Sequence, residues 1–205
     1  MIASLIFRCC SNNRAWIELP NFQFFLLTSL VSSVVFLRAI NVGGANLCKP
    51  AQLAKQLSRF DIVNIGAVGT FVVRKKVSDA TLRTAIAKKL SFKCEIMIVP
   101  SKVVLDLARK DPLARQPSGP DLTRFVSVLH KRPPKLPALP LSLPSEKDWL
   151  LRIVAIPNRF VVGIYRRQMK AIGYLGKIEK ILGVPATTRS WNTLEKIFKV
   201  LETKQ

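Results

Sequence analysis

The chain has 205 residues, with 33 Lys and Arg, 12 Asp and Glu and one His, and its formal net charge is +21. Hydrophobic residues make up 49% of the chain, which excludes the low hydrophobicity of a disordered basic tail. Four irregularly spaced cysteines exclude a disulfide scaffold and favour a reduced, cytoplasmic setting, and the single histidine excludes a histidine-rich metal site.

The amino-terminal segment 19–37 carries no charge and approaches the length of about 20 residues that spans a bilayer. Polar residues near Pro20 and four Ser or Thr residues weaken that interpretation, and the β-branched residues of 31–40 favour a strand. We therefore predict that residues 1–29 form an extension outside the core. Membrane association through this segment is disfavoured but stays open.

Residues 30–100 are predicted to form the first of two units. Hydrophobic periodicity and turn residues indicate, in chain order, a strand at 31–40, a glycine turn at 41–46, a helix from Pro50, strands at 61–67 and 70–74, a helix at 79–90 and a strand at 95–99. The order β-α-β-β-α-β is that of a ferredoxin-like unit, in which two helices cover one face of an antiparallel sheet.

Residues 101–205 are predicted to form a second, less regular α+β unit. The expected elements are a helix at 101–110, a strand at 123–130, a proline-rich connector at 131–144, a hairpin of 149–156 with 159–165, and helices at 171–182 and 193–203. The fold class is therefore α+β, with two ferredoxin-like halves and mainly antiparallel sheets.

Two segments carry a family resemblance. Residues 36–46 read FLRAINVGGAN, which resembles the opening LRGINVGGKN pattern of a bacterial family of uncharacterised proteins, the domain of unknown function 1697. Residues 182–194 read LGVPATTRSWNTL, which resembles the LG…TTRNWNTV signature of the same family. The resemblance implies a compact protein of two ferredoxin-like halves and implies no established activity.

The same two segments supply a candidate ligand site, composed of Asn41, Gly43, Gly44, Asn46, Arg189, Trp191, Asn192 and Thr193. Backbone N–H groups of a glycine turn before a helix can hold an anion, and Arg189 can pair with one. Both segments also have a structural interpretation, in which the asparagines cap backbone groups and Trp191 packs the last helix.

A second candidate site is the basic surface formed by Arg159, Arg166, Arg167, Lys170, Lys177 and Lys180. Residues 152–189 contain 8 basic residues and one acidic residue. This bias is compatible with a polyanion such as nucleic acid as partner, and the structural interpretation is a solvated face whose charges serve solubility. The alternative function is a small-ligand or enzymatic site in the cleft between the halves. No zinc site, phosphate-binding loop or catalytic triad is recognisable, so no metal or cofactor is predicted and enzymatic activity stays open.

Overall fold

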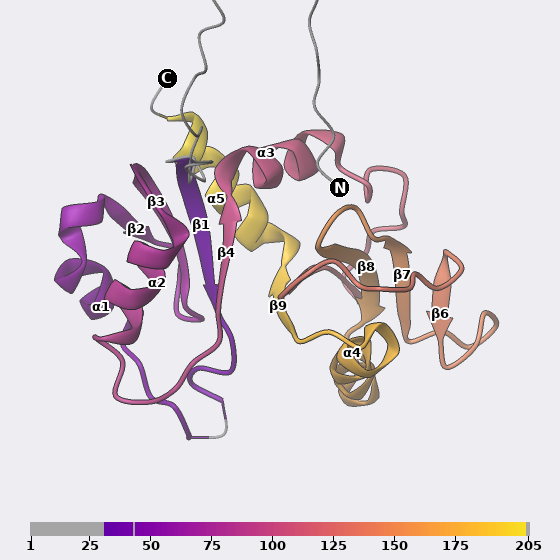
Figure 1. The fold of residues 1–205 in the computed structure, drawn as a ribbon. Helices are drawn as coiled ribbons and strands as arrows, with labels where there is room; N and C mark the ends of the chain where they lie inside the picture. The colour runs from indigo at the N-terminus through magenta and orange to yellow at the C-terminus, as the bar shows by residue number, and fades with distance from the viewer. Residues whose placement is uncertain (1–30, 43, 204–205) are drawn as a thin grey trace, which may run out of the picture.

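The first unit is a four-stranded sheet with helices on its outer face (Figure 1). The computed structural model describes residues 31–42 and 44–203, so the predicted extension over 1–29 lies outside the described residues. The sheet order is β2-β3-β1-β4, with every pair antiparallel. Its elements are β1 (Val31–Leu37), α1 (Pro50–Gln56), the 3₁₀ helix η1 (Ser58–Phe60), β2 (Ile62–Asn64), β3 (Thr70–Val77), α2 (Asp79–Ala87) and β4 (Ile96–Pro100).

Local sequence explains where these helices begin. Pro50 occupies the first turn of α1, where its missing N–H costs no hydrogen bond. Ser78 precedes α2 and its hydroxyl accepts a hydrogen bond from the Thr81 N–H at 3.2 Å. In β1, alternate side chains face opposite sides, so Val35 and Leu37 pack against the helices while the intervening residues face the interior of the protein.

The second unit is a five-stranded antiparallel sheet of order β6-β7-β8-β5-β9. Helix α3 (Ser101–Lys110) connects the two units. The later elements are β5 (Leu122–Leu129), β6 (Leu141–Leu143), β7 (Leu151–Ala155), β8 (Phe160–Arg166), α4 (Met169–Leu182), β9 (Ala186–Ser190) and α5 (Trp191–Glu202). Helix α4 covers the outer face of this sheet, where Ile178 and Leu182 pack against it.

A central core joins the two units. It combines the inner faces of both sheets with α3 and α5, and includes Phe36, Val99, Phe160, Trp191 and Leu194. In Figure 1, α3 and α5 lie between the two sheets. The last helix of the chain is therefore packed against strands from both ends of the sequence, and its first residues are fixed by this core.

The α+β class and the antiparallel sheets are confirmed, whereas the ferredoxin-like detail is not. Two segments differ from expectation: residues 141–143 of the predicted connector form β6 and pair with β7, and residues 186–190, between the last two predicted helices, form the strand β9. The strand prediction for 31–40 is confirmed over Val31–Leu37. Within residues 31–42 and 44–203, no helix has the length and apolar character needed to span a bilayer.

Candidate functional site

The loop after β1 is held by its own asparagines. The Asn41 side chain donates to the carbonyls of Cys48 at 2.9 Å and Ala67 at 3.3 Å, and accepts from the Cys48 N–H at 2.8 Å. The Asn46 amide donates to the carbonyl of Ala39 at 3.0 Å. Gly44 has φ +78°, which suits glycine, and Gly43 lies outside the described residues. In the described part of this loop, the asparagine side chains therefore stabilise the turn.

Arg189 in β9 ties the two units together from inside the protein. The residue is only 7% exposed, and burial lowers its pKa to about 10, so the guanidinium stays charged at neutral pH. Its hydrogen bonds, of 2.7 to 2.8 Å, end on the side-chain oxygens of Thr70 and Thr187 and on the carbonyls of Leu37, Val68 and Thr188. These use all five N–H donors of the guanidinium. None is left for a ligand.

The residues that follow Arg189 divide between the core and the surface. Trp191 is 4% exposed and packs in the central core. Thr193 places its hydroxyl 3.1 Å from that of Ser190. The Asn192 side chain is exposed and makes no hydrogen bond with the described residues. Of this motif, Asn192 is thus the residue most available to a ligand.

Asn192 lines a polar pocket of about 270 Å³. The pocket lies where β5 and α5 begin and just after β8 ends, and its polar lining is Ser118, Thr123, Arg124, Arg167, Ser190 and Asn192. No acidic residue lines it, and none of residues 41–46 does. We call this the α5 pocket. The structure therefore joins the two predicted motifs through Arg189, which donates to the Leu37 carbonyl, but places Asn192 in the α5 pocket, which no residue of 41–46 lines.

The two arginines of the α5 pocket retain most of their hydrogen-bonding capacity. The Arg124 side chain makes no hydrogen bond or ion pair with the described residues. Arg167 uses only Nε, which donates to Thr123 Oγ1 at 3.1 Å. Sequence reasoning missed Arg124, because a single arginine in a strand gives no signal until the strand's neighbours are known.

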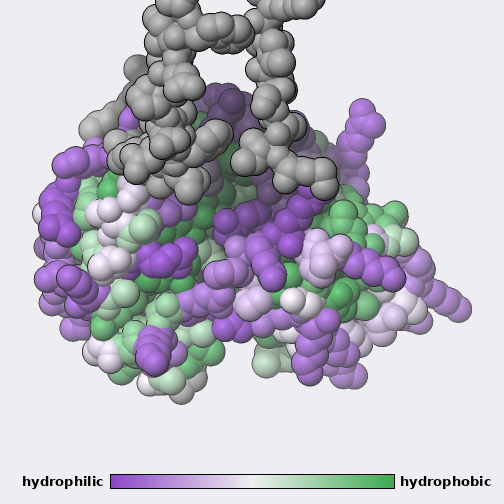
Figure 2. Space-filling model, viewed as in Figure 1, coloured by the Kyte–Doolittle hydropathy of each residue, from purple (hydrophilic) through white to green (hydrophobic). Residues whose placement is uncertain are grey.

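The predicted basic surface is only partly available to a partner. Arg159 donates to the carbonyls of Leu129 and Ile98, and Arg166 is held over the Trp149 ring and pairs with Asp121 at 3.3 Å. Lys177 lies 4.5 Å from the centroid of the Tyr174 ring. Arg167, Lys170 and Lys180 are exposed. Among the described residues, the side chain of Arg167 hydrogen-bonds only with Thr123, and the two lysine side chains have no hydrogen-bond or ion-pair partner. Figure 2 shows hydrophilic residues spread over both units in that view.

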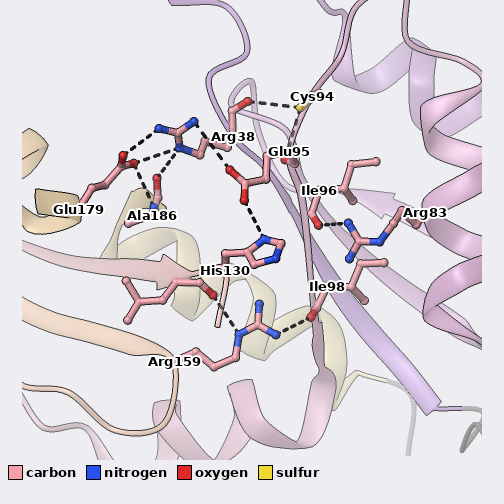
Figure 3. A network of polar contacts seen from close by, with 11 residues as sticks. Arg38, Arg83, Cys94, Glu95, Ile96, Ile98, His130, Arg159, Glu179 and Ala186 are labelled. Carbon is pink, nitrogen blue, oxygen red and sulfur yellow. Dashed lines mark hydrogen bonds and ion pairs between the residues drawn. The ribbon is translucent and has the colours of Figure 1, made fainter. Parts of the chain in front are cut away.

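A separate network of charges fixes the junction of the two units (Figure 3). Arg38, just after β1, contacts both carboxylate oxygens of Glu179 in α4, at 2.8 and 3.0 Å, and lies 3.8 Å from Glu95. The other Glu95 oxygen is 2.7 Å from His130 Nδ1. The hydrogen bond to Glu179 raises the pKa of Arg38. Burial favours protonated Glu179, but its hydrogen bonds from Arg38 and the Ala186 N–H outweigh this and lower its pKa.

Two arginines cap the free edge of the first sheet beside this network. Strand β4 lies at that edge. Arg83 donates to the carbonyl of Ile96 at 2.5 Å, and Arg159 donates to that of Ile98 at 3.2 Å. Burial lowers the pKa of Arg159. Because these carbonyls already accept hydrogen bonds, the edge is protected against pairing with another strand, and the role of Arg159 is structural.

Comparison with known proteins identifies a family. A family described as "Protein of unknown function (DUF1697)" matches residues 31–148. The FLRAINVGGAN segment lies within this range, and the TTRSWNT segment lies beyond it. No curated protein and no solved structure matches the chain.

Proposed function

This chain belongs to the family of proteins of unknown function DUF1697, and we propose that it binds single-stranded nucleic acid through its phosphates. The observation that carries the proposal is the α5 pocket, which Arg124 and Arg167 line and no acidic residue lines. We place this activity in the bacterial cytoplasm, because of the family resemblance and because Cys48 and Cys94 are free thiols.

Phosphate is the chemistry that best matches the α5 pocket. Arginine presents a planar set of donors suited to phosphate oxygens, and both arginines that line the pocket lack a carboxylate partner among the described residues. Exposed Lys170, three residues after Arg167, has no acidic partner among the described residues. The net charge of +21 attracts polyanions from a distance. Binding would therefore combine a local phosphate contact with long-range attraction.

A flexible nucleic acid strand fits this geometry better than an anionic membrane does. The unpaired arginines line a recess, and a strand can bend to place one phosphate inside it, whereas a flat bilayer contacts protruding surfaces. Exposed Lys170 and Lys180 on α4 can then contact further phosphates.

A small-ligand or enzymatic site between the halves has less support. That alternative relied on Arg189 and on the loop asparagines. The Arg189 guanidinium has no free donor, and the Asn41 side-chain amide both donates to and accepts from the backbone of Cys48. We therefore leave both residues out of the proposed site.

The test is fluorescence anisotropy of a labelled single-stranded RNA of about 12 nucleotides, a length within the range of single-strand sites. At low salt we expect saturable binding. The double variant Arg124→Ala/Arg167→Ala should bind about tenfold more weakly or worse, since each charge-assisted hydrogen bond contributes about 1.5–3 kcal/mol. Circular dichroism checks that both proteins are folded.

A matched control separates a site from general attraction. Lys88→Ala/Lys89→Ala removes the same charge from exposed positions after α2 in the first unit, and should change the affinity less than about threefold. Equal losses in the two double variants would contradict a site at the α5 pocket. Absence of any binding at low salt would refute the proposed function.

A further inference from the structure

The α5 pocket has the size of a site for one small anionic group. Its volume of about 270 Å³ lies just below the range of about 300–1,000 Å³ typical of small-molecule sites. A terminal phosphate with part of its sugar can fill such a space, whereas an internal phosphate would bring the strand on both of its sides to the mouth of the pocket. The pocket is therefore better suited to the end of a strand than to its middle.

The charges around the pocket favour two negative charges over one. Arg124 has all of its donors free and Arg167 has all but Nε. An internal phosphodiester carries one negative charge and neutralises one guanidinium. A terminal phosphate carries about −1.5 to −2 at pH 7 and can neutralise both.

The beginning of α5 adds further donors on the same side. The residue before the helix, Ser190, makes no capping hydrogen bond, and the first turn contains no acidic side chain. The N–H groups of that turn have no partner within the helix and are polarised by its dipole. The Asn192 amide lies beside them at the pocket wall. These groups supplement the arginine pair, which carries the main charge.

From this arrangement we infer that the α5 pocket recognises a phosphate monoester at the end of a nucleic acid strand. The inference rests on the proposed function and names the part of the strand that the pocket holds. Internal phosphates contact the exposed lysines of α4, and the terminal phosphate occupies the pocket between the two arginines.

The experiment compares three RNAs of one sequence, bearing a 5′-phosphate, a 3′-phosphate or hydroxyl groups at both ends. We expect one phosphorylated RNA to bind about tenfold more tightly than the hydroxyl RNA, the effect of roughly one additional charge-assisted hydrogen bond. The preferred end identifies the strand polarity. Inorganic phosphate should compete with the phosphorylated RNA and have less effect on the hydroxyl RNA.

Variants connect this preference to the pocket. Arg124→Ala and Asn192→Ala should bring the affinity ratio of phosphorylated to hydroxyl RNA towards one, and Lys180→Ala on the exposed face of α4 should weaken all three RNAs alike. Equal affinities of the wild type for all three RNAs would overturn the inference while leaving the proposed function intact. If the wild type bound none of the three RNAs, both the proposed function and the inference would be refuted.

Discussion

Replacing Arg189 by methionine should destabilise the protein severely, although it removes a charge from a strongly basic chain. Methionine preserves much of the side-chain length but has no donor. The substitution leaves the oxygens of Thr70 and Leu37 without their arginine partner, at positions that are 0% and 1% exposed. Because the lost bonds cross between the sheets, the change also weakens the junction of the two units.

The magnitude follows from the acceptors that lose their partner. A buried acceptor without a hydrogen bond costs about 1–3 kcal/mol, and two of them cost about 2–6 kcal/mol. Removing the buried guanidinium recovers part of its desolvation cost, so we expect a net loss of about 2–5 kcal/mol. Typical domains have a free energy of unfolding of about 5–15 kcal/mol, so this loss is a large fraction of the total.

Urea unfolding followed by tryptophan fluorescence measures this loss, since Trp191 is buried and lies two residues after Arg189. The urea midpoint should fall while the slope stays constant. The control Arg132→Met changes an exposed arginine and should alter the free energy of unfolding by less than about 0.5 kcal/mol. A loss below about 1 kcal/mol for Arg189→Met would refute the assignment of Arg189 as a tie between the sheets.

Two further predictions concern the junction and the second sheet. The pKa of Glu179 in the folded protein lies below the ordinary glutamate value of about 4.3, so ionised Glu179 stabilises the fold above that pH, and this stabilisation is lost as pH falls through the folded pKa. The urea midpoint should therefore fall less between about pH 5 and 3 in Glu179→Gln than in the wild type. Parallel curves of midpoint against pH for the two proteins would contradict this. Gly163→Ala should lower the melting temperature, with a cost of about 1–3 kcal/mol, because a Cβ there would collide with the Arg152 carbonyl and lie 2.8 Å from the Phe125 ring. The control Gly176→Ala lies on a helix, has no atom within 4 Å of the added Cβ and should raise the melting temperature. Equal effects of the two substitutions would contradict the predicted crowding at Gly163.

Most elements of the fold could be predicted from local patterns, and the exceptions share a cause. Helix α3 begins and ends at the predicted residues, because an apolar face and flanking prolines define it. Strand β9 reads Ala-Thr-Thr-Arg-Ser and has no apolar alternation, since buried Arg189 and Thr187 hydrogen-bond to each other instead of packing as hydrophobic residues. Strand β6 could not be recognised in the sequence, because prolines flank it; it lies at the edge of its sheet, where proline is tolerated.

The candidate site was less predictable, because it depends on residues brought together by the sheet order. Asn192 was identified from the sequence, whereas Arg124 was not, since β5 precedes α5 by about 60 residues. The sequence around Arg189 is compatible with two roles, because an arginine among hydroxyl residues can bind an anion or the protein's own carbonyls. Only its hydrogen-bond partners distinguish the two roles.

The salt dependence of RNA binding tests the central claim most directly. Each phosphate contact on a single strand contributes about 0.7 to the slope of log affinity against log salt concentration. If Arg124 and Arg167 each contact phosphate, the wild type should have a slope steeper by about 1.4 than the variant Arg124→Ala/Arg167→Ala, while Lys88→Ala/Lys89→Ala keeps the wild-type slope. Identical slopes for the wild type and the arginine variant would contradict phosphate binding in the α5 pocket.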